Sequence, residues 1–227
     1  MNGVASQWTY GVQQGKNTVT DPLGNVAVHN WGYLHALNNT VLSSSMYEMS
    51  ATYSDSSAHL LRTVSNQYAS EYDPINKSVA NARVISQTTT LENGQVMQKQ
   101  TDFATFTYAC NVGGGYCPAT ATRFDPTSER EYDYGTSAPG PLLGTTSTAY
   151  KSFLIGGTTI TKPQTVTIYD GSGHQAAQTV YEYDIYSHAN QPMQASGAVQ
   201  HSASYGTSYT NRGNVTAAAA TAEIIGT

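Results

Sequence analysis

Three pairs of acidic residues are the first feature of this 227-residue chain that could do chemistry. The unit Glu-Tyr-Asp occurs at 71–73, 131–133 and 182–184. In a strand, alternate residues share one face, so the two acids of a unit would lie roughly 7 Å apart. Glycosidases hold two carboxylates at about that separation. A catalytic pair is needed only once, however, so the repetition favours a structural role in which tyrosine fills a sheet face and the acids lead into a turn.

The cysteine and histidine residues do not form a recognisable catalytic motif. Cys110 and Cys117 flank a glycine-rich stretch and are candidates for a disulfide or for two free thiols. Structural zinc needs about four ligands, and a thioredoxin-like motif has two residues between its cysteines where this chain has six. The six histidines form no zinc-protease or nucleophile motif. Neither 170–173 nor 125–129 matches a complete calcium loop. We therefore predict no catalytic, metal or cofactor residue.

Aromatic residues are the remaining candidates for ligand contact. The chain has 17 tyrosines and two tryptophans, Trp8 and Trp31. Such rings can stack on sugars or bury a partner's surface. Trp8 and Trp31 are therefore predicted as ligand-stacking residues.

Composition limits the class of protein. Only 11% of the residues are charged and 39% are hydrophobic, with tyrosine, threonine and valine prominent. This composition is typical of β-sheets and excludes helical bundles. The net charge is −5 and the 10 basic residues are not clustered, so nucleic acid is not an expected partner. No apolar run is long enough for a membrane span. The N-terminal residues lack a signal peptide's pattern, so the chain is either intracellular or part of a longer protein.

Alternating residues and glycine-containing turns predict consecutive β-hairpins. The clearest is 164–184, where two strands of period two flank the turn at 170–173. The same pattern of strand, glycine-containing turn and strand occurs at 16–31, 83–101 and 205–216. The predicted fold class is all-β, with antiparallel hairpins forming an extended, curved or spiralling sheet.

The chain is predicted to be a single β-rich repeat region, 1–227. A loop or linker is expected at 135–141, and the Ala-rich tail, 217–227, is expected to be frayed. A short helix between 38 and 70 is an alternative to strands there.

Several motifs together resemble the RHS or YD-repeat proteins of bacteria. They lie at 20–26, 169–173, 181–184 and 210–216. The repeat residues are Asp21, Gly24, Asn25, Tyr72, Asp73, Tyr132, Asp133, Tyr169, Asp170, Gly173, Tyr183, Asp184, Gly213 and Asn214. Asp21-Pro22-Leu23-Gly24 also resembles the start of that family's self-cleavage signature, but Asn25 replaces its leucine and favours an ordinary turn.

The resemblance implies a sheet that spirals into a hollow shell, secreted or at the cell surface, which encloses a toxic polypeptide or contacts another protein. The chain has too few units for a closed shell, so it would be a segment or a shortened relative. The leading hypothesis is a non-enzymatic structural or interaction module that associates through sheet edges or contacts an enclosed or adjacent polypeptide. The alternative is a carbohydrate-binding or adhesive module. A polysaccharide-active enzyme fragment ranks last.

Overall fold

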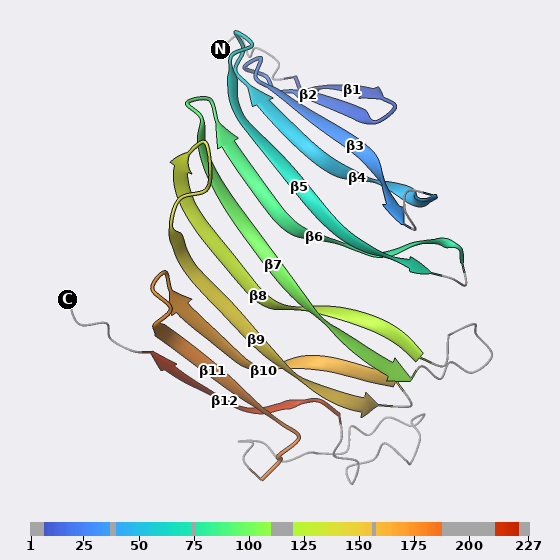
Figure 1. Cartoon of the computed structure of the whole chain (residues 1–227), viewed down its shortest axis with the longest axis vertical. Coiled ribbons are helices and arrows are strands. Elements are labelled where there is room, and N and C mark those ends of the chain that lie inside the picture. Colours follow the sequence, from blue (N-terminus) through green and yellow to red (C-terminus); the bar gives the residue numbers. More distant parts are fainter. Residues whose placement is uncertain are drawn as a thin grey trace, which may run out of the picture. The chain divides into compact units, whose positions relative to one another are not determined.

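The protein is an antiparallel β-sheet in which every strand lies beside its neighbours in sequence (Figure 1). The computed structural model describes residues 7–36, 40–73, 76–109, 120–155, 158–187 and 212–222. The twelve strands of this part of the chain follow the order β1 to β12 without a crossover. They are β1 Thr9–Gln13, β2 Lys16–Thr20, β3 Val26–Ala36, β4 Val41–Ser54, β5 Leu60–Asp73, β6 Ser78–Leu91, β7 Gln95–Ala109, β8 Thr120–Thr136, β9 Leu142–Ile155, β10 Thr158–Asp170, β11 Gln175–Tyr183 and β12 Val215–Ala222.

Residue contacts divide the chain into two units. The first comprises Met1–Asp102 and Arg130–Leu143, and the second comprises Phe103–Glu129 and Gly144–Thr227. The all-β class and the hairpins at 16–31, 83–101 and 164–184 are confirmed. No helix in the described part of the chain is long and apolar enough to cross a membrane.

Three segments differ from their prediction. The region where a short helix was an alternative forms β4 and β5 instead. The start of the predicted frayed tail, 217–222, belongs to β12, because its alanines pair in register with β11. Helix propensity is a weak preference that such pairing overrides. In the predicted loop at 135–141, Gly135 and Thr136 still belong to β8, and residues 137–141 connect it to β9.

The pairing of β12 with β11 is an addition to the predicted hairpins. Val215 and Thr216 were expected to pair with 205–210, which lie outside the described residues. Among the described residues, β12 pairs with β11, with Val215 opposite Tyr183.

Burial is sparse on both faces of the sheet. Among the described residues, the buried hydrophobic side chains are Leu34, Ala51, Val79, Val96, Phe153 and Tyr183. In the second unit, the rings of Phe153 and Tyr183 meet edge to face with their centres 5.1 Å apart. The Tyr183 hydroxyl donates a hydrogen bond to the carbonyl of Pro163, and burial raises the pKa of this phenol. Tyr183 therefore fills the sheet face, as its Glu-Tyr-Asp unit predicts.

Period-two alternation locates β10 but not its buried side. Val166 and Ile168 share the apolar face of the predicted strand. Thr167, on the opposite face, is 5% exposed, whereas Ile168 is 47% exposed. The described part of the chain therefore leaves Ile168, on the apolar face of this strand, uncovered.

Candidate functional site

A five-residue turn with aspartate at its first position closes three hairpins. In the turn 21–25, the Asp21 N–H donates to the carbonyl of Asn25 at 2.9 Å, and the Gly24 N–H donates to the carbonyl of Asp21 at 3.0 Å. The turns 55–59 and 170–174 repeat both hydrogen bonds. The fourth residue has a left-handed φ in each case, 88° at Gly24, 65° at Ala58 and 85° at Gly173. Glycine is the usual residue at such a position because it has no Cβ.

The carboxylate of the first residue holds the turn together. Asp21 Oδ1 accepts from the N–H groups of Leu23 and Asn25 at 2.8 and 2.9 Å, and the Asn25 amide donates to Oδ2 at 2.8 Å. Asp55 and Asp170 have a histidine at the fifth position of their turns. Oδ1 of each aspartate accepts from the backbone N–H of that histidine, and Oδ2 lies within hydrogen-bond distance of its ring Nδ1. Hydrogen bonds from the fifth residue are the main cause that lowers the pKa of each aspartate. These acids therefore act as charged turn caps.

Asp184 forms a related arrangement with residues far along the chain, although its own φ is 63° and the Gly213 N–H donates to its carboxylate instead of its carbonyl. The Asp184 N–H donates to the carbonyl of Asn214 at 3.0 Å, as Asp21 does to Asn25. Its carboxylate accepts from the N–H groups of Arg212, Gly213 and Asn214 at 2.9, 2.7 and 3.1 Å. Gly213 has a φ of 66°, which matches Gly24. The two predicted repeat motifs at 181–184 and 210–216 are therefore two halves of one split turn.

The other Glu-Tyr-Asp acids also make structural contacts. Asp133 donates its N–H to the carbonyl of Pro141 and accepts from Gly140 N–H, so this turn is a lengthened version of 21–25. The Asp73 carboxylate accepts from the side chain and N–H of Asn76. Glu131 pairs with Lys99 at 3.1 Å, and Glu71 accepts from Asn81 at 3.1 Å. Within the described ranges, no group of three or more acidic, histidine or cysteine side chains could hold a metal ion.

The tyrosines of these units lie in strands. Tyr72 lies opposite Val79 on β6, and the Tyr132 hydroxyl is 3.4 Å from the side-chain oxygen of Gln100. Tyr169 lies opposite Gln175 in the residue pair that precedes the turn 170–174.

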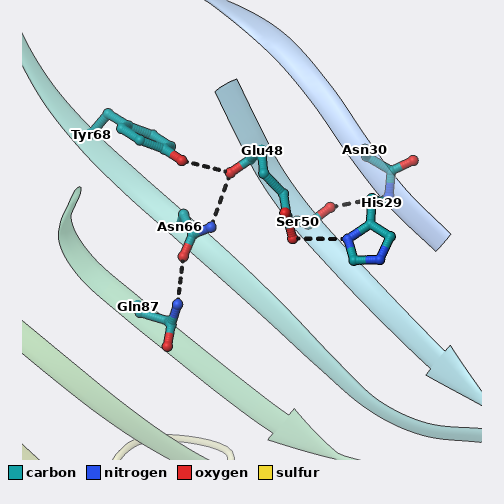
Figure 2. Close-up of polar contacts among 7 residues, drawn as sticks. All are labelled: His29, Asn30, Glu48, Ser50, Asn66, Tyr68 and Gln87. Carbon is teal, nitrogen blue, oxygen red and sulfur yellow. Dashed lines mark hydrogen bonds and ion pairs between the residues drawn. The ribbon is translucent and has the colours of Figure 1, made fainter. Parts of the chain in front are cut away.

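A polar network spans the first unit where β4 and β5 separate (Figure 2). These strands pair only between Ser50–Ser54 and Leu60–Ser65, although each has 14 residues. Beyond that point, the Asn66 amide and the Tyr68 hydroxyl donate to the backbone carbonyl of Glu48 at 3.0 and 2.9 Å. Burial raises the pKa of Tyr68 above its ordinary value. Side chains thus replace the missing backbone partners of Glu48.

The network continues to both sides of that gap. The Glu48 carboxylate lies 3.2 Å from the His29 ring on β3, and Asn66 accepts from Gln87 on β6 at 3.0 Å. Asn30 donates to the Ser50 hydroxyl at 3.2 Å. The network therefore links strands β3 to β6 through hydrogen bonds among its own residues.

Both predicted stacking residues line hollows in the first unit. Trp8 lines a hollow of about 440 Å³, and its side chain is 55% exposed. Trp31 lines two others, of about 260 and 440 Å³. The Trp8 hollow is the most apolar, because valine, alanine and leucine side chains contribute to its wall.

A row of directly opposed residues forms the floor of the Trp8 hollow. The row crosses five strands in register and consists of Val19, Ala27, Tyr53, Arg62 and Leu91. At about 4.8 Å per strand it spans roughly 19 Å. Each member lies one to three residues from a turn, so we call this site the turn-end groove. It is defined by this row together with Trp8, Asp21, Asn25 and Ser54. The guanidinium of Arg62 lies 4.3 Å from the centre of the Tyr53 ring.

Several site residues escape sequence reasoning. The turn at 55–59 has alanine where glycine is expected, although histidine four residues after aspartate also marks the turn at 170. Tyr53 and Arg62 become neighbours only through strand register. The disulfide candidates Cys110 and Cys117 lie outside the described residues.

No family model and no curated protein sequence matches the chain. Among solved structures, it matches a porin-like protein from Bacteroides uniformis at 12% sequence identity and a TM-score of 0.35. The match covers 78% of this chain and 69% of that chain. At that score the likeness carries no inference about function.

Proposed function

We propose that the chain is a non-enzymatic structural and interaction module, a segment of a β-sheet wall of the RHS/YD-repeat kind. The observation that carries this proposal is the sparse burial of the sheet. In the described part of the chain no large side chain is fully buried, and exposed hydrophobic residues include Leu23, Leu143, Leu154 and Ile168. A sheet normally buries one face against a second layer. Here another polypeptide would supply that cover.

The edge strands support association with another chain. β1 is exposed along its whole length, with Tyr10 71% and Val12 81% exposed. Neither TYGVQ in β1 nor VTAAAATA in β12 contains a charged residue or a proline. Monomeric proteins usually protect their edges with such residues. The two edges are therefore suited to strand addition.

The strand count also favours end-to-end extension. With twelve alternating strands, β1 and β12 run in opposite directions. A second copy in the same orientation would therefore place its β1 antiparallel to the β12 of the first. Such a contact is head-to-tail and can repeat, which suits a wall that grows by adding sheets.

The turns support the resemblance to YD repeats. At 132–133, 169–170 and 183–184, tyrosine is followed by an aspartate whose N–H and carbonyl form a turn or whose carboxylate caps it. The dipeptide thus has a physical role that can recur along a repeat. The proposed setting is secreted or cell-surface, the proposed partners are proteins, and neither nucleic acid nor a cofactor is part of the proposal.

Sedimentation velocity with edge variants tests this function. A double variant with Val12→Lys and Ala220→Lys places a charge on each edge strand. We expect this variant to be monomeric at concentrations at which the wild type assembles. A matched control carries Ser57→Lys and Ser172→Lys, which add the same charge at turns. A wild-type protein that stays monomeric at high concentration would overturn the proposal, as would equal association of both variants.

A further inference from the structure

The turn-end groove combines flat apolar rings with one cationic group. Trp8 and the half-buried Tyr53 supply the rings, and Val19, Ala27 and Leu91 supply an apolar floor. The small side chain of Ala27 lies between Val19 and Tyr53 in the row, which leaves space above it. A ligand ring with an apolar face would therefore find both a floor and a stacking partner.

Arg62 gives the groove its charge preference. Its side chain is exposed, and among the described residues it forms no ion pair with a carboxylate. Both oxygens of Asp21, the acid of the groove, already accept hydrogen bonds within their own turn. A guanidinium binds carboxylates through two parallel hydrogen bonds, and its stacking on Tyr53 holds its plane in position. The ligand that complements Arg62 is therefore anionic.

The backbone of the floor favours a saccharide over a peptide. Each residue of the row lies inside a paired ladder, so the floor offers no unpaired strand to an extended peptide. Recognition must come from side chains. Ser54 and Asn25 place a hydroxyl and an amide at the wall, which suit sugar hydroxyls, and about 440 Å³ lies within the size range of small-ligand sites.

We propose that the turn-end groove binds a saccharide that contains a hexuronate. The pyranose ring stacks on Trp8, and the uronate carboxylate pairs with Arg62. Although Trp8 directly precedes the edge strand β1, the other groove residues lie on β2 to β6 and in the turn 21–25. Saccharide binding does not require strand addition, so the proposal goes beyond the structural function and does not depend on it.

Calorimetric titration tests the proposal with two matched ligands, trigalacturonate and the neutral galactotriose of the same linkage. We expect the wild type to bind the uronate at least tenfold more tightly than the neutral sugar. Arg62→Gln should abolish that preference and leave weak neutral binding, whereas Trp8→Ala should weaken binding of both ligands at least tenfold. Tyr33→Ala, which removes an exposed aromatic ring from a hollow that shares no residue with the groove, is the control and should change neither affinity.

Two further measurements separate the contribution of the Arg62 charge from that of its planar guanidinium group. Arg62→Lys keeps the charge but not the planar group, so it should restore only part of the preference. The preference should also fall as salt increases. No detectable uronate binding, equal wild-type affinities for both ligands, or an unchanged preference in Arg62→Gln would each overturn the proposal. Circular dichroism of the exposed-site variants confirms that the sheet is intact. Titration at concentrations where the protein is monomeric keeps this result separate from the assembly test.

Discussion

Removing residues 186–211 should convert the split turn into a continuous one. The deletion joins Asp184-Ile185 to Arg212-Gly213-Asn214, which has the spacing of Asp21-Pro22-Leu23-Gly24-Asn25. The hydrogen bonds of Asp184 match that turn in part, since its carboxylate accepts from the residues that would become the third and fifth. The residue that would become the fourth, Gly213, also donates to the carboxylate, whereas Gly24 donates to the Asp21 carbonyl, so its N–H has to change acceptor. The pair that precedes the turn also matches, with Tyr183 opposite Val215 as Thr20 is opposite Val26.

The expected gain in stability follows from loop closure. Asp184 and Asn214 are 30 residues apart, whereas Asp21 and Asn25 are 4 apart. The closure entropy scales as (3/2)RT ln n, so the shorter connection should stabilise the fold by about 2 kcal/mol. The deletion also removes two hydrogen bonds of the Tyr186 hydroxyl, to Asp184 and Asn214. One of these hydrogen bonds is exposed and the other is part-buried, and a typical hydrogen bond contributes about 1 kcal/mol at most under such conditions, so they offset only part of the gain.

Urea denaturation measures this gain, with two controls. Deletion of 186–210 leaves one extra residue in the turn, which moves Gly213 out of the fourth position and should lose most of the stabilisation. Asp184→Ala within the 186–211 deletion removes the cap and should cost about 2 kcal/mol. If the 186–211 deletion lowers the free energy of unfolding, or if Asp184→Ala has no effect in it, the equivalence of the turns is wrong.

Three other perturbations test the turns and the polar network. Ala58→Gly should raise the free energy of unfolding by about 1 kcal/mol, because alanine at a φ of 65° is strained; an unchanged urea midpoint would contradict this. Because folding lowers the pKa of Asp21, Asp55 and Asp170, their contribution is present above the unfolded pKa of about 3.9 and is lost as pH falls through the lower folded pKa. Replacing all three by asparagine should flatten stability below about pH 4, and an unchanged acid slope in urea titrations would refute the assignment. Tyr68→Phe should cost about 1 kcal/mol in urea denaturation by removing a donor to the Glu48 carbonyl, while the exposed Tyr134→Phe should be neutral; equal effects would contradict the bridging role.

The hairpins are predictable from sequence because their signals are local. Aspartate and glycine at fixed spacing specify a turn, and alternation specifies the flanking strands. The turn at 55–59 escapes because Ala58 occupies the left-handed position and gives no glycine signal. The alanines of β12 escape because their conformation depends on pairing with β11, which no local pattern encodes.

The groove could be predicted only in part. Trp8 is recognisable as a candidate because tryptophan is rare in this chain and suited to stacking. Its neighbours Ala27, Tyr53 and Arg62 come from different strands and meet through register. Register in a sheet with weakly contrasted faces is poorly specified by sequence, and here irregularities such as the one between Tyr53 and Ser54 shift it further.

The proposed function depends on the outer edges of β1 and β12, which have no strand partner among the described residues. Amide hydrogen exchange, measured from dilute to concentrated protein, tests it most directly. If these edges pair with other copies, protection rises with concentration in β1 and β12, while the interior strand β6 keeps the same protection throughout. Exchange in β1 and β12 that does not depend on concentration would contradict it.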